Sequence, residues 1–202
     1  MTVSLRERKK AETRVALAAA ALHLAVERGP DRVTVDEIAA AAGVSQRTFF
    51  NYFGSKEDAI LGNASASTSR LVEELSARPA VEPPLVALRA AMHASVDHLQ
   101  SDPDDWIARN RLVRGHPSLG VRYAARLADL ERELVFEIAH RTGLDADRDP
   151  YPGIVTGAAM AGARVALTVW QEQRPQRSLP ALLDEVFEQL TAGLAPPARR
   201  GS

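Results

Sequence analysis

Apolar side chains recur at steps of three and four residues along most of the chain, the periodicity of helices with one buried face. The first such segment covers residues 11–28 and ends at Gly29-Pro30. Later segments are predicted at residues 85–100, 106–113, 119–142, 153–173 and 179–194. The sequence offers no alternating run long enough for a strand and no internal repeat. It therefore predicts an all-α fold.

Between the first segment and the later ones, short helices carry clear capping signals. Thr34 and Glu37 have the spacing of a capping box, which predicts a helix over residues 35–42. Gly43 is predicted to close it in the left-handed conformation. We expect Ser45 to begin a second helix over residues 46–53.

The second short helix is predicted to end at Gly54 in the same left-handed way, and Ser55 to cap a further helix that begins at Lys56. Internal packing is expected from the apolar side chains Ile38, Ala42, Val44, Phe49 and Phe50. Two short helices joined by a glycine-containing turn are typical of the helix-turn-helix, which places its second helix in the DNA major groove. The outward face of that helix would carry Gln46, Arg47, Thr48, Asn51 and Tyr52, which can donate to base edges or phosphates.

These residues resemble a known family. The segment from Thr34 to Glu57, above all Tyr52-Phe53-Gly54-Ser55-Lys56-Glu57, is similar to the N-terminal domain of TetR-family regulators. The resemblance covers about the first sixty residues. It implies a homodimer of nine-helix or ten-helix subunits, each with a ligand pocket in its C-terminal body.

The resemblance also assigns roles to individual residues. Base and backbone contacts fall to Gln46, Arg47, Thr48 and Asn51, although many members have His or Arg where this chain has Asn51. Phosphate contacts fall to Thr34, Tyr52 and Lys56, and an N-terminal arm to Arg6, Arg8 and Lys9. With the cap residue added, the predicted DNA-contacting set is Thr34, Ser45, Gln46, Arg47, Thr48, Asn51, Tyr52, Lys56, Arg6, Arg8 and Lys9.

We predict a DNA-binding domain over residues 1–56 and a ligand-binding and dimerisation domain over residues 57–202. The body resembles mycofactocin-type regulators of actinobacteria at Leu88-Arg89-Ala90-Ala91, Arg109-Asn110-Arg111-Leu112 and Pro117-Ser118-Leu119. That resemblance implies an acyl-thioester, such as an acyl-CoA, or another apolar or anionic effector.

The candidate effector residues are His93, Trp106, Arg109, His116 and Arg164. Those between 106 and 116 could line a pocket with neighbouring arginines, or the arginines Arg111 and Arg114 could simply pair with Asp104 or Asp105. Arg164 interrupts an apolar helix, where a buried charge is costly without a partner. Either a ligand or carboxylate meets it, or it faces Glu185 or solvent.

Small residues at Gly157, Ala158, Ala161 and Gly162 permit close helix approach, and leucines line one face of the last helix. Together they predict a homodimer through the last two helices. The alternative is that both faces belong to the core of one subunit.

The composition excludes several classes of protein. The chain of 202 residues has no cysteine, so it has neither disulfides nor thiolate metal sites. Its histidines are scattered, so we expect no metal, and without a phosphate loop or nucleophile-base set we expect no enzyme and no cofactor beyond an effector of unknown identity. Residues 154–170 approach the length of a membrane span but contain Arg164. We interpret them as a buried helix of a cytoplasmic protein without a signal peptide or membrane partner.

The net charge of −1 is low for a protein that binds DNA, but basic residues gather within the first fourteen positions. The sequence thus predicts a ligand-responsive repressor that binds double-stranded DNA at a pseudo-palindromic operator as a homodimer. The alternative is a helical module that binds a small molecule or protein and whose helix-turn-helix is non-functional.

Overall fold

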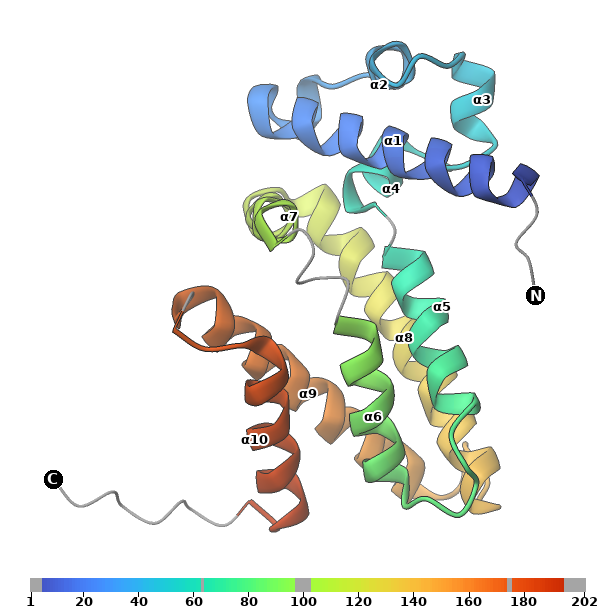
Figure 1. The fold of residues 1–202 in the computed structure, drawn as a ribbon, viewed down its shortest axis with the longest axis vertical. Coiled ribbons are helices and arrows are strands. Elements are labelled where there is room, and N and C mark those ends of the chain that lie inside the picture. Colours follow the sequence, from blue (N-terminus) through green and yellow to red (C-terminus); the bar gives the residue numbers. More distant parts are fainter. Residues whose placement is uncertain (1–4, 63, 97–102, 174–175, 195–202) are drawn as a thin grey trace, which may run out of the picture. The chain divides into compact units, whose positions relative to one another are not determined.

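The computed structural model describes residues 5–62, 64–96, 103–173 and 176–194 (Figure 1). Throughout these residues the regular elements are helices, which confirms the all-α prediction. In chain order they are α1 (Leu5–Arg28), η1 (Pro30–Arg32), α2 (Val35–Ala41), α3 (Gln46–Phe50), α4 (Lys56–Leu61), α5 (Ala64–Ser76), α6 (Pro84–Val96), α7 (Pro103–Gly115), α8 (Pro117–Thr142), α9 (Pro150–Gln173) and α10 (Leu179–Thr191). The end of the predicted helix at 85–100, with His98, lies outside the described residues.

The chain divides into two compact units. The first unit comprises Met1–Thr68 and Asp102–Ala128, and the second comprises Ser69–Ser101 and Asp129–Ser202. The first unit therefore contains α7 and the first half of α8 in addition to the helix-turn-helix. The predicted domain boundary at residue 56 stays a prediction.

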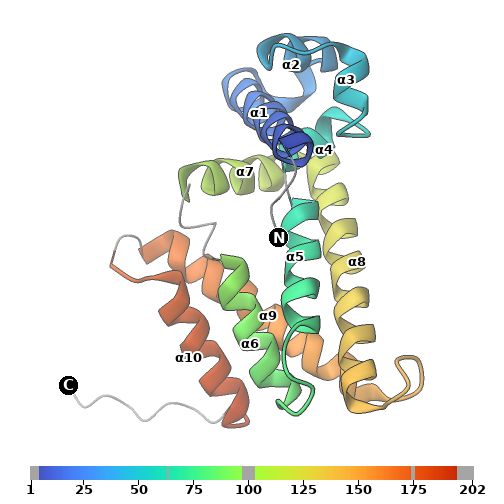
Figure 2. The ribbon, with the colours of Figure 1, turned by 45° about the vertical axis from the view of Figure 1, so that its right-hand side comes forward.

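In the first unit, α1 packs against α2, α4 and α7, and α2 packs against α3 (Figure 2). Its core holds Leu17, Ile38, Phe49 and Ile60, all fully buried. These side chains come from four helices, so the short α2, α3 and α4 gain their stability from burial against α1 rather than from their own length.

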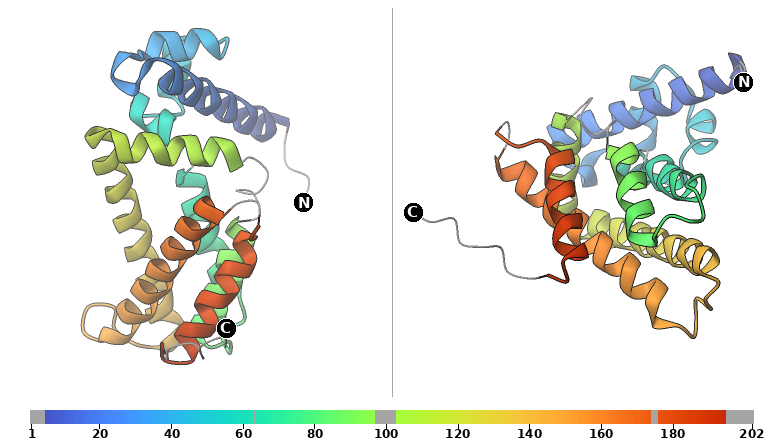
Figure 3. Two further views of the ribbon diagram at one scale, coloured as in Figure 1. Left: turned by 90° about the vertical axis from the view of Figure 1, so that its left-hand side faces the viewer. Right: turned by 60° about the horizontal axis from the view of Figure 1, so that its bottom comes forward.

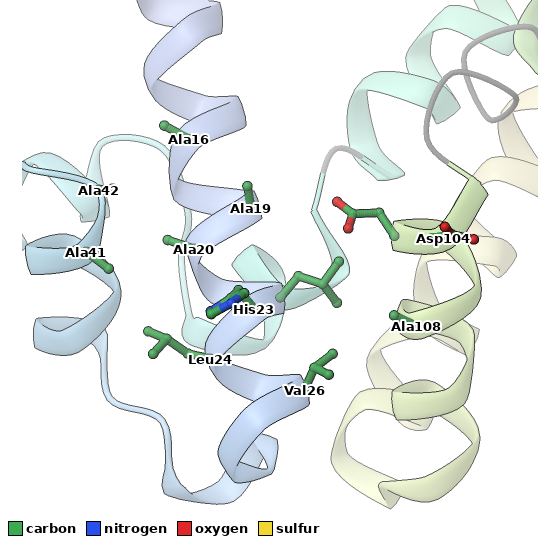
Figure 4. Close-up of a pocket in the computed structure, with 12 residues that line it drawn as sticks. Ala16, Ala19, Ala20, His23, Leu24, Val26, Ala41, Ala42, Asp104 and Ala108 are labelled. Carbon is green, nitrogen blue, oxygen red and sulfur yellow. The ribbon is translucent and has the colours of Figure 1, made fainter.

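An open hollow of about 750 Å³ lies between α1, α2 and α7 of this unit (Figure 4). Alanine methyl groups form much of its lining, and its ionisable lining groups are His23, Asp104 and Asp105. None of the five predicted effector residues is among the side chains that line it.

In the second unit, α9 packs against α10, and α6 packs against both (Figure 3). Its core includes Leu88, Leu134, Ile138 and Phe187. A side-chain carbon placed on Gly162 would overlap the side chain of Val186. The close approach predicted from the small residues of α9 therefore occurs, at this glycine, within one chain.

Among the described residues, α9 is the helix that is long and apolar enough to cross a membrane, with a mean hydropathy of 1.3. Its buried residues include Thr156, Ala159 and Trp170, whereas Ile154 and Val165 are 65% and 56% exposed. The prediction of a buried helix is therefore wrong for one face of α9 in the single chain. The buried side of α9 packs against α6 and α10.

Candidate DNA-binding interface

The predicted capping box at the start of α2 is confirmed. The Thr34 amide donates to the Glu37 carboxylate at 2.9 Å, and the Glu37 amide donates to the Thr34 hydroxyl oxygen at 3.3 Å. The Thr34 hydroxyl also donates to the Glu37 carboxylate at 2.9 Å, and the two bonds that this carboxylate accepts, from the Thr34 amide and hydroxyl, lower the pKa of Glu37 below its ordinary value. Two amides that a helix start leaves unpaired are thus satisfied.

The turn between α2 and α3 also forms as predicted. Gly43 has a φ of 68°, in the left-handed region that suits glycine. The Ser45 hydroxyl then accepts from the Thr48 amide at 3.1 Å and caps α3. The two helices are consequently joined by a short turn, as a helix-turn-helix requires.

The end of α3 differs from the prediction. The helix stops at Phe50, not at residue 53, and Gly54 does not take the left-handed conformation. The Arg14 guanidinium donates to the Tyr52 carbonyl at 2.7 Å and lies 4.5 Å from the centre of the Phe53 ring. Phe53 is buried, so the chain turns inward there instead of continuing the helix.

The outer face of α3 carries Gln46, Arg47 and Asn51, all exposed as predicted. Thr48 is half-buried, and its hydroxyl lies 2.9 Å from that of Ser45. The first three side chains are therefore available to base edges, whereas Thr48 and Ser45 already hydrogen-bond to each other.

Phe50 was expected to contribute to the internal packing of the helix-turn-helix, and that expectation is wrong. Its side chain is 53% exposed, while Phe49 and Phe53 are 0% and 3% exposed. Because α3 turns by about 100° per residue, Phe50 lies between Gln46 and Arg47 on the outer face. Its apolar character alone placed Phe50 in the core, whereas its helical spacing from Gln46 predicts that it lies on the outer face.

The predicted phosphate-contacting residues lie close to the fold's own polar groups. The Lys56 ammonium donates to the carbonyls of Asp31 and Val33 at 3.2 and 2.9 Å, which links α4 to the loop before α2. Tyr52 is half-buried and Thr34 is exposed. Their contacts with phosphate stay predictions.

The predicted N-terminal arm is the first part of α1, which begins at Leu5. Arg8 lies 3.5 Å from Glu12, and both side chains are exposed. Lys9 is also exposed, and the Arg6 side chain lies outside the described part of the chain.

Asp58 joins α4 to α8 within the first unit. Its carboxylate accepts from Arg122 at 3.1 Å, from Arg126 at 3.0 Å and from the Ser55 hydroxyl at 2.9 Å. Burial lowers the pKa of the neighbouring Arg14, and the positive charge of Arg126 lowers it further. One carboxylate thus balances several partly buried guanidinium groups.

The five predicted effector residues fall in both units. Trp106, Arg109 and His116 belong to the first unit, and His93 and Arg164 to the second. Arg109 donates to the Ile60 carbonyl at 2.8 Å, at the end of α4. It thereby contributes to the internal packing of the first unit.

His93 and Arg164 have different environments. The His93 ring lies 2.8 Å from the Asp184 carboxylate, which also accepts from Arg89. Arg164 is exposed in the single chain, in keeping with the alternative that it faces solvent. Within the described residues, no group of acidic residues and histidines is arranged to hold a metal.

Comparison with known proteins agrees with this architecture. The model of the family "Bacterial regulatory proteins, tetR family" matches residues 17–60, and that of the "MftR C-terminal domain" matches residues 82–195. The helix-turn-helix and the helical body behind it define a DNA-binding transcriptional regulator with a C-terminal ligand-binding domain.

Similar proteins support the assignment along the whole chain. The transcriptional regulator TcmR of Streptomyces glaucescens is 34% identical over 95% of this chain and 87% of its own length. The putative mycofactocin biosynthesis regulator MftR of Mycobacterium tuberculosis is 27% identical, covering 93% of each chain. The crystal structure of Thermus thermophilus FadR has a TM-score of 0.55 at 23% identity, covering 94% of this chain and 98% of that one. This chain therefore belongs to the TetR family of transcriptional regulators.

Proposed function

We propose that this regulator is a cytoplasmic repressor that binds a pseudo-palindromic operator as a homodimer. The observation that carries the proposal is the capped helix pair with Gln46, Arg47 and Asn51 exposed on α3. Two such helices related by a two-fold axis would read half-sites separated by one or more turns of DNA, roughly 34 Å or a multiple of it.

The dimer is proposed to form through α9 and α10. Ile154 and Val165 on α9 are more than half exposed, although the helix is apolar enough to resemble a membrane span. A second copy would remove these side chains from water, which stabilises the association in proportion to the apolar area covered.

The proposed effector is a long-chain acyl-CoA or another apolar or anionic small molecule. The match to the MftR C-terminal domain supports this class, and the similar FadR of Thermus thermophilus was solved in complex with lauroyl-CoA. The residues proposed for effector binding are His93, Trp106, Arg109, His116 and Arg164. An effector can weaken operator binding only to the extent that it binds the DNA-free conformation more tightly than the DNA-bound conformation.

The test begins with duplexes selected from a random-sequence library by the purified protein. Fluorescence anisotropy with the selected duplex measures affinity, and sedimentation measures how many subunits bind. Arg47→Ala should weaken binding by about 5-fold to 150-fold, the value of one good base contact. Arg132→Ala is the matched control, because Arg132 is exposed on α8 and lies in the second unit.

Equal affinity of Arg47→Ala and the unchanged protein would contradict the assignment of that residue. Failure to select any duplex, or binding without salt dependence, would favour the non-functional helix-turn-helix. Lauroyl-CoA is then added to the protein–operator complex, with free coenzyme A as the control. We expect release only with the acylated form; no release at saturation would contradict the acyl-CoA class.

A further inference from the structure

Phe50 is an exposed aromatic side chain at the centre of the proposed DNA-reading face. It is 53% exposed on the last turn of α3, with Gln46 and Arg47 on either side in the helical projection. In the free protein, a large apolar side chain that lies exposed among polar ones contributes little to the stability of the fold. Its position suggests that the partner bound by α3 covers it.

The Phe50 ring has a defined position before any partner arrives. Its ring centre lies 5.4 Å from that of Phe49 with the planes at 89°, an edge-to-face arrangement. Phe49 itself is fully buried, and Arg14 holds the chain that follows by donating to the Tyr52 carbonyl. An aromatic side chain fixed in this way loses little conformational entropy on binding.

The chemistry of Phe50 restricts what it can recognise. Its ring has no hydrogen-bond donor or acceptor, so it cannot bind a phosphate or the polar edge of a base. In the major groove the apolar group that distinguishes one base from the others is the C5-methyl of thymine. Gln46 and Arg47, its neighbours, supply donors for purine edges beside it.

We propose that Phe50 is a specificity-determining residue that recognises a thymine in each half-site through its C5-methyl group. This inference rests on the proposed function, because it requires α3 to enter the major groove. Gln46 and Arg47 would select adjacent positions by hydrogen bonds, and Phe50 would add selection by apolar contact alone.

The test removes the methyl group and the ring separately and together. In the selected duplex, each thymine is replaced in turn by deoxyuridine, which lacks only the C5-methyl, and affinity is measured for the unchanged protein and for Phe50→Ala. Burying one methyl group contributes about 0.8 kcal/mol, which corresponds to about fourfold in affinity. We expect one deoxyuridine position per half-site to weaken the unchanged protein by about fourfold and to leave Phe50→Ala unaffected.

Arg47→Ala is the matched control, since it should keep the fourfold effect of the same deoxyuridine. Phe50→Leu retains apolar volume and should keep part of it. Because Phe50 is 53% exposed but packs on Phe49, Phe50→Ala should lower Tm only by the loss of that edge-to-face contact, and both variants should stay folded at the temperature of the binding assay.

Several results would overturn the proposal. If Phe50→Ala weakens every duplex equally and no deoxyuridine position couples to it, the ring lies on the sugar-phosphate backbone or another partner covers it. If no thymine occurs in the selected half-sites, the inference fails while the proposed function stands. If no duplex is selected at all, the proposed function fails as well.

Discussion

Asp58 balances the positive charge that α8 brings to α4, and replacing it tests how the first unit is held together. In Asp58→Asn the side chain keeps its shape and can still accept from Ser55. The negative charge between Arg122 and Arg126 is lost. The Arg126 guanidinium then remains near Arg14, whose charge repels it.

The magnitude follows from the exposure of each partner. Asp58 and Arg126 are 21% and 20% exposed, so this contact is worth more than a surface pair. Arg122 is 48% exposed, and its share falls within the 0–1 kcal/mol typical of surface pairs. Hydrogen bonds to charged groups contribute about 1.5–3 kcal/mol. We therefore expect Asp58→Asn to lower the free energy of unfolding by about 2 kcal/mol, which lowers Tm by about 4–8 °C in a chain of this size.

The measurement is urea and thermal unfolding of Asp58→Asn and of a control, Asp129→Asn. Asp129 pairs with Arg132 on the same helix, but both side chains are more than 60% exposed, so the control should change stability by less than about 0.5 kcal/mol. The double variant Asp58→Asn/Arg126→Met removes the unbalanced guanidinium and should be more stable than Asp58→Asn alone. Equal effects of the two single variants would refute the reasoning.

Two further predictions concern the second unit. Gly162→Ala should lower the free energy of unfolding by about 1–2 kcal/mol, measured with urea, because the added methyl group overlaps Val186. Gly153→Ala is the control, since its added methyl group would meet no neighbouring atom and should not destabilise the protein. Equal stability of the two variants would contradict the close contact at Gly162. Burial raises the pKa of Asp184, but hydrogen bonds from Arg89 and His93 outweigh it, and the net pKa is lowered. A depressed folded pKa stabilises above the unfolded pKa, near 4, and this stabilisation is lost as the pH falls through the folded value. Between pH 6 and pH 3 the Tm of the unchanged protein should therefore fall further than the Tm of Asp184→Asn. An equal fall in both proteins would argue against a stabilising role of the Asp184 carboxylate.

Local signals in the sequence correctly predicted the caps and the turn of the helix-turn-helix. The cap at Thr34, the left-handed Gly43 and the cap at Ser45 depend on hydrogen bonds within a few residues, and all three form. Contacts distant in sequence decided what was missed. The end of α3 depends on Arg14, thirty-eight residues before the carbonyl that it binds.

Burial was harder to predict than helix position. Phe49, Phe50 and Phe53 are the same residue type, but among these three only Phe50 is exposed, because Phe49 and Phe53 belong to the buried cluster that includes Leu17 of α1 and Ile38 of α2. The apolar neighbours of Arg164 in the sequence left open whether it is buried or faces solvent, and its side chain is exposed in the single chain. A periodic pattern identifies the apolar faces of helices, but it does not indicate whether another helix of the same chain or a partner covers each face.

The distribution of arginine contacts bears on how this regulator recognises DNA. Arg14 binds the carbonyl that follows α3, Arg109 binds the end of α4, and Arg122 and Arg126 bind Asp58, so these four arginines of the first unit support its own fold. Since non-specific affinity for DNA depends on charges facing phosphates, those arginines add little to it from where they lie. On the proposed function, discrimination would rest on the outer face of α3, where Gln46 and Arg47, which can donate hydrogen bonds to DNA, lie on either side of the exposed Phe50 ring. In such an interface, loss of one methyl group on the DNA should matter as much as loss of a weak ion pair.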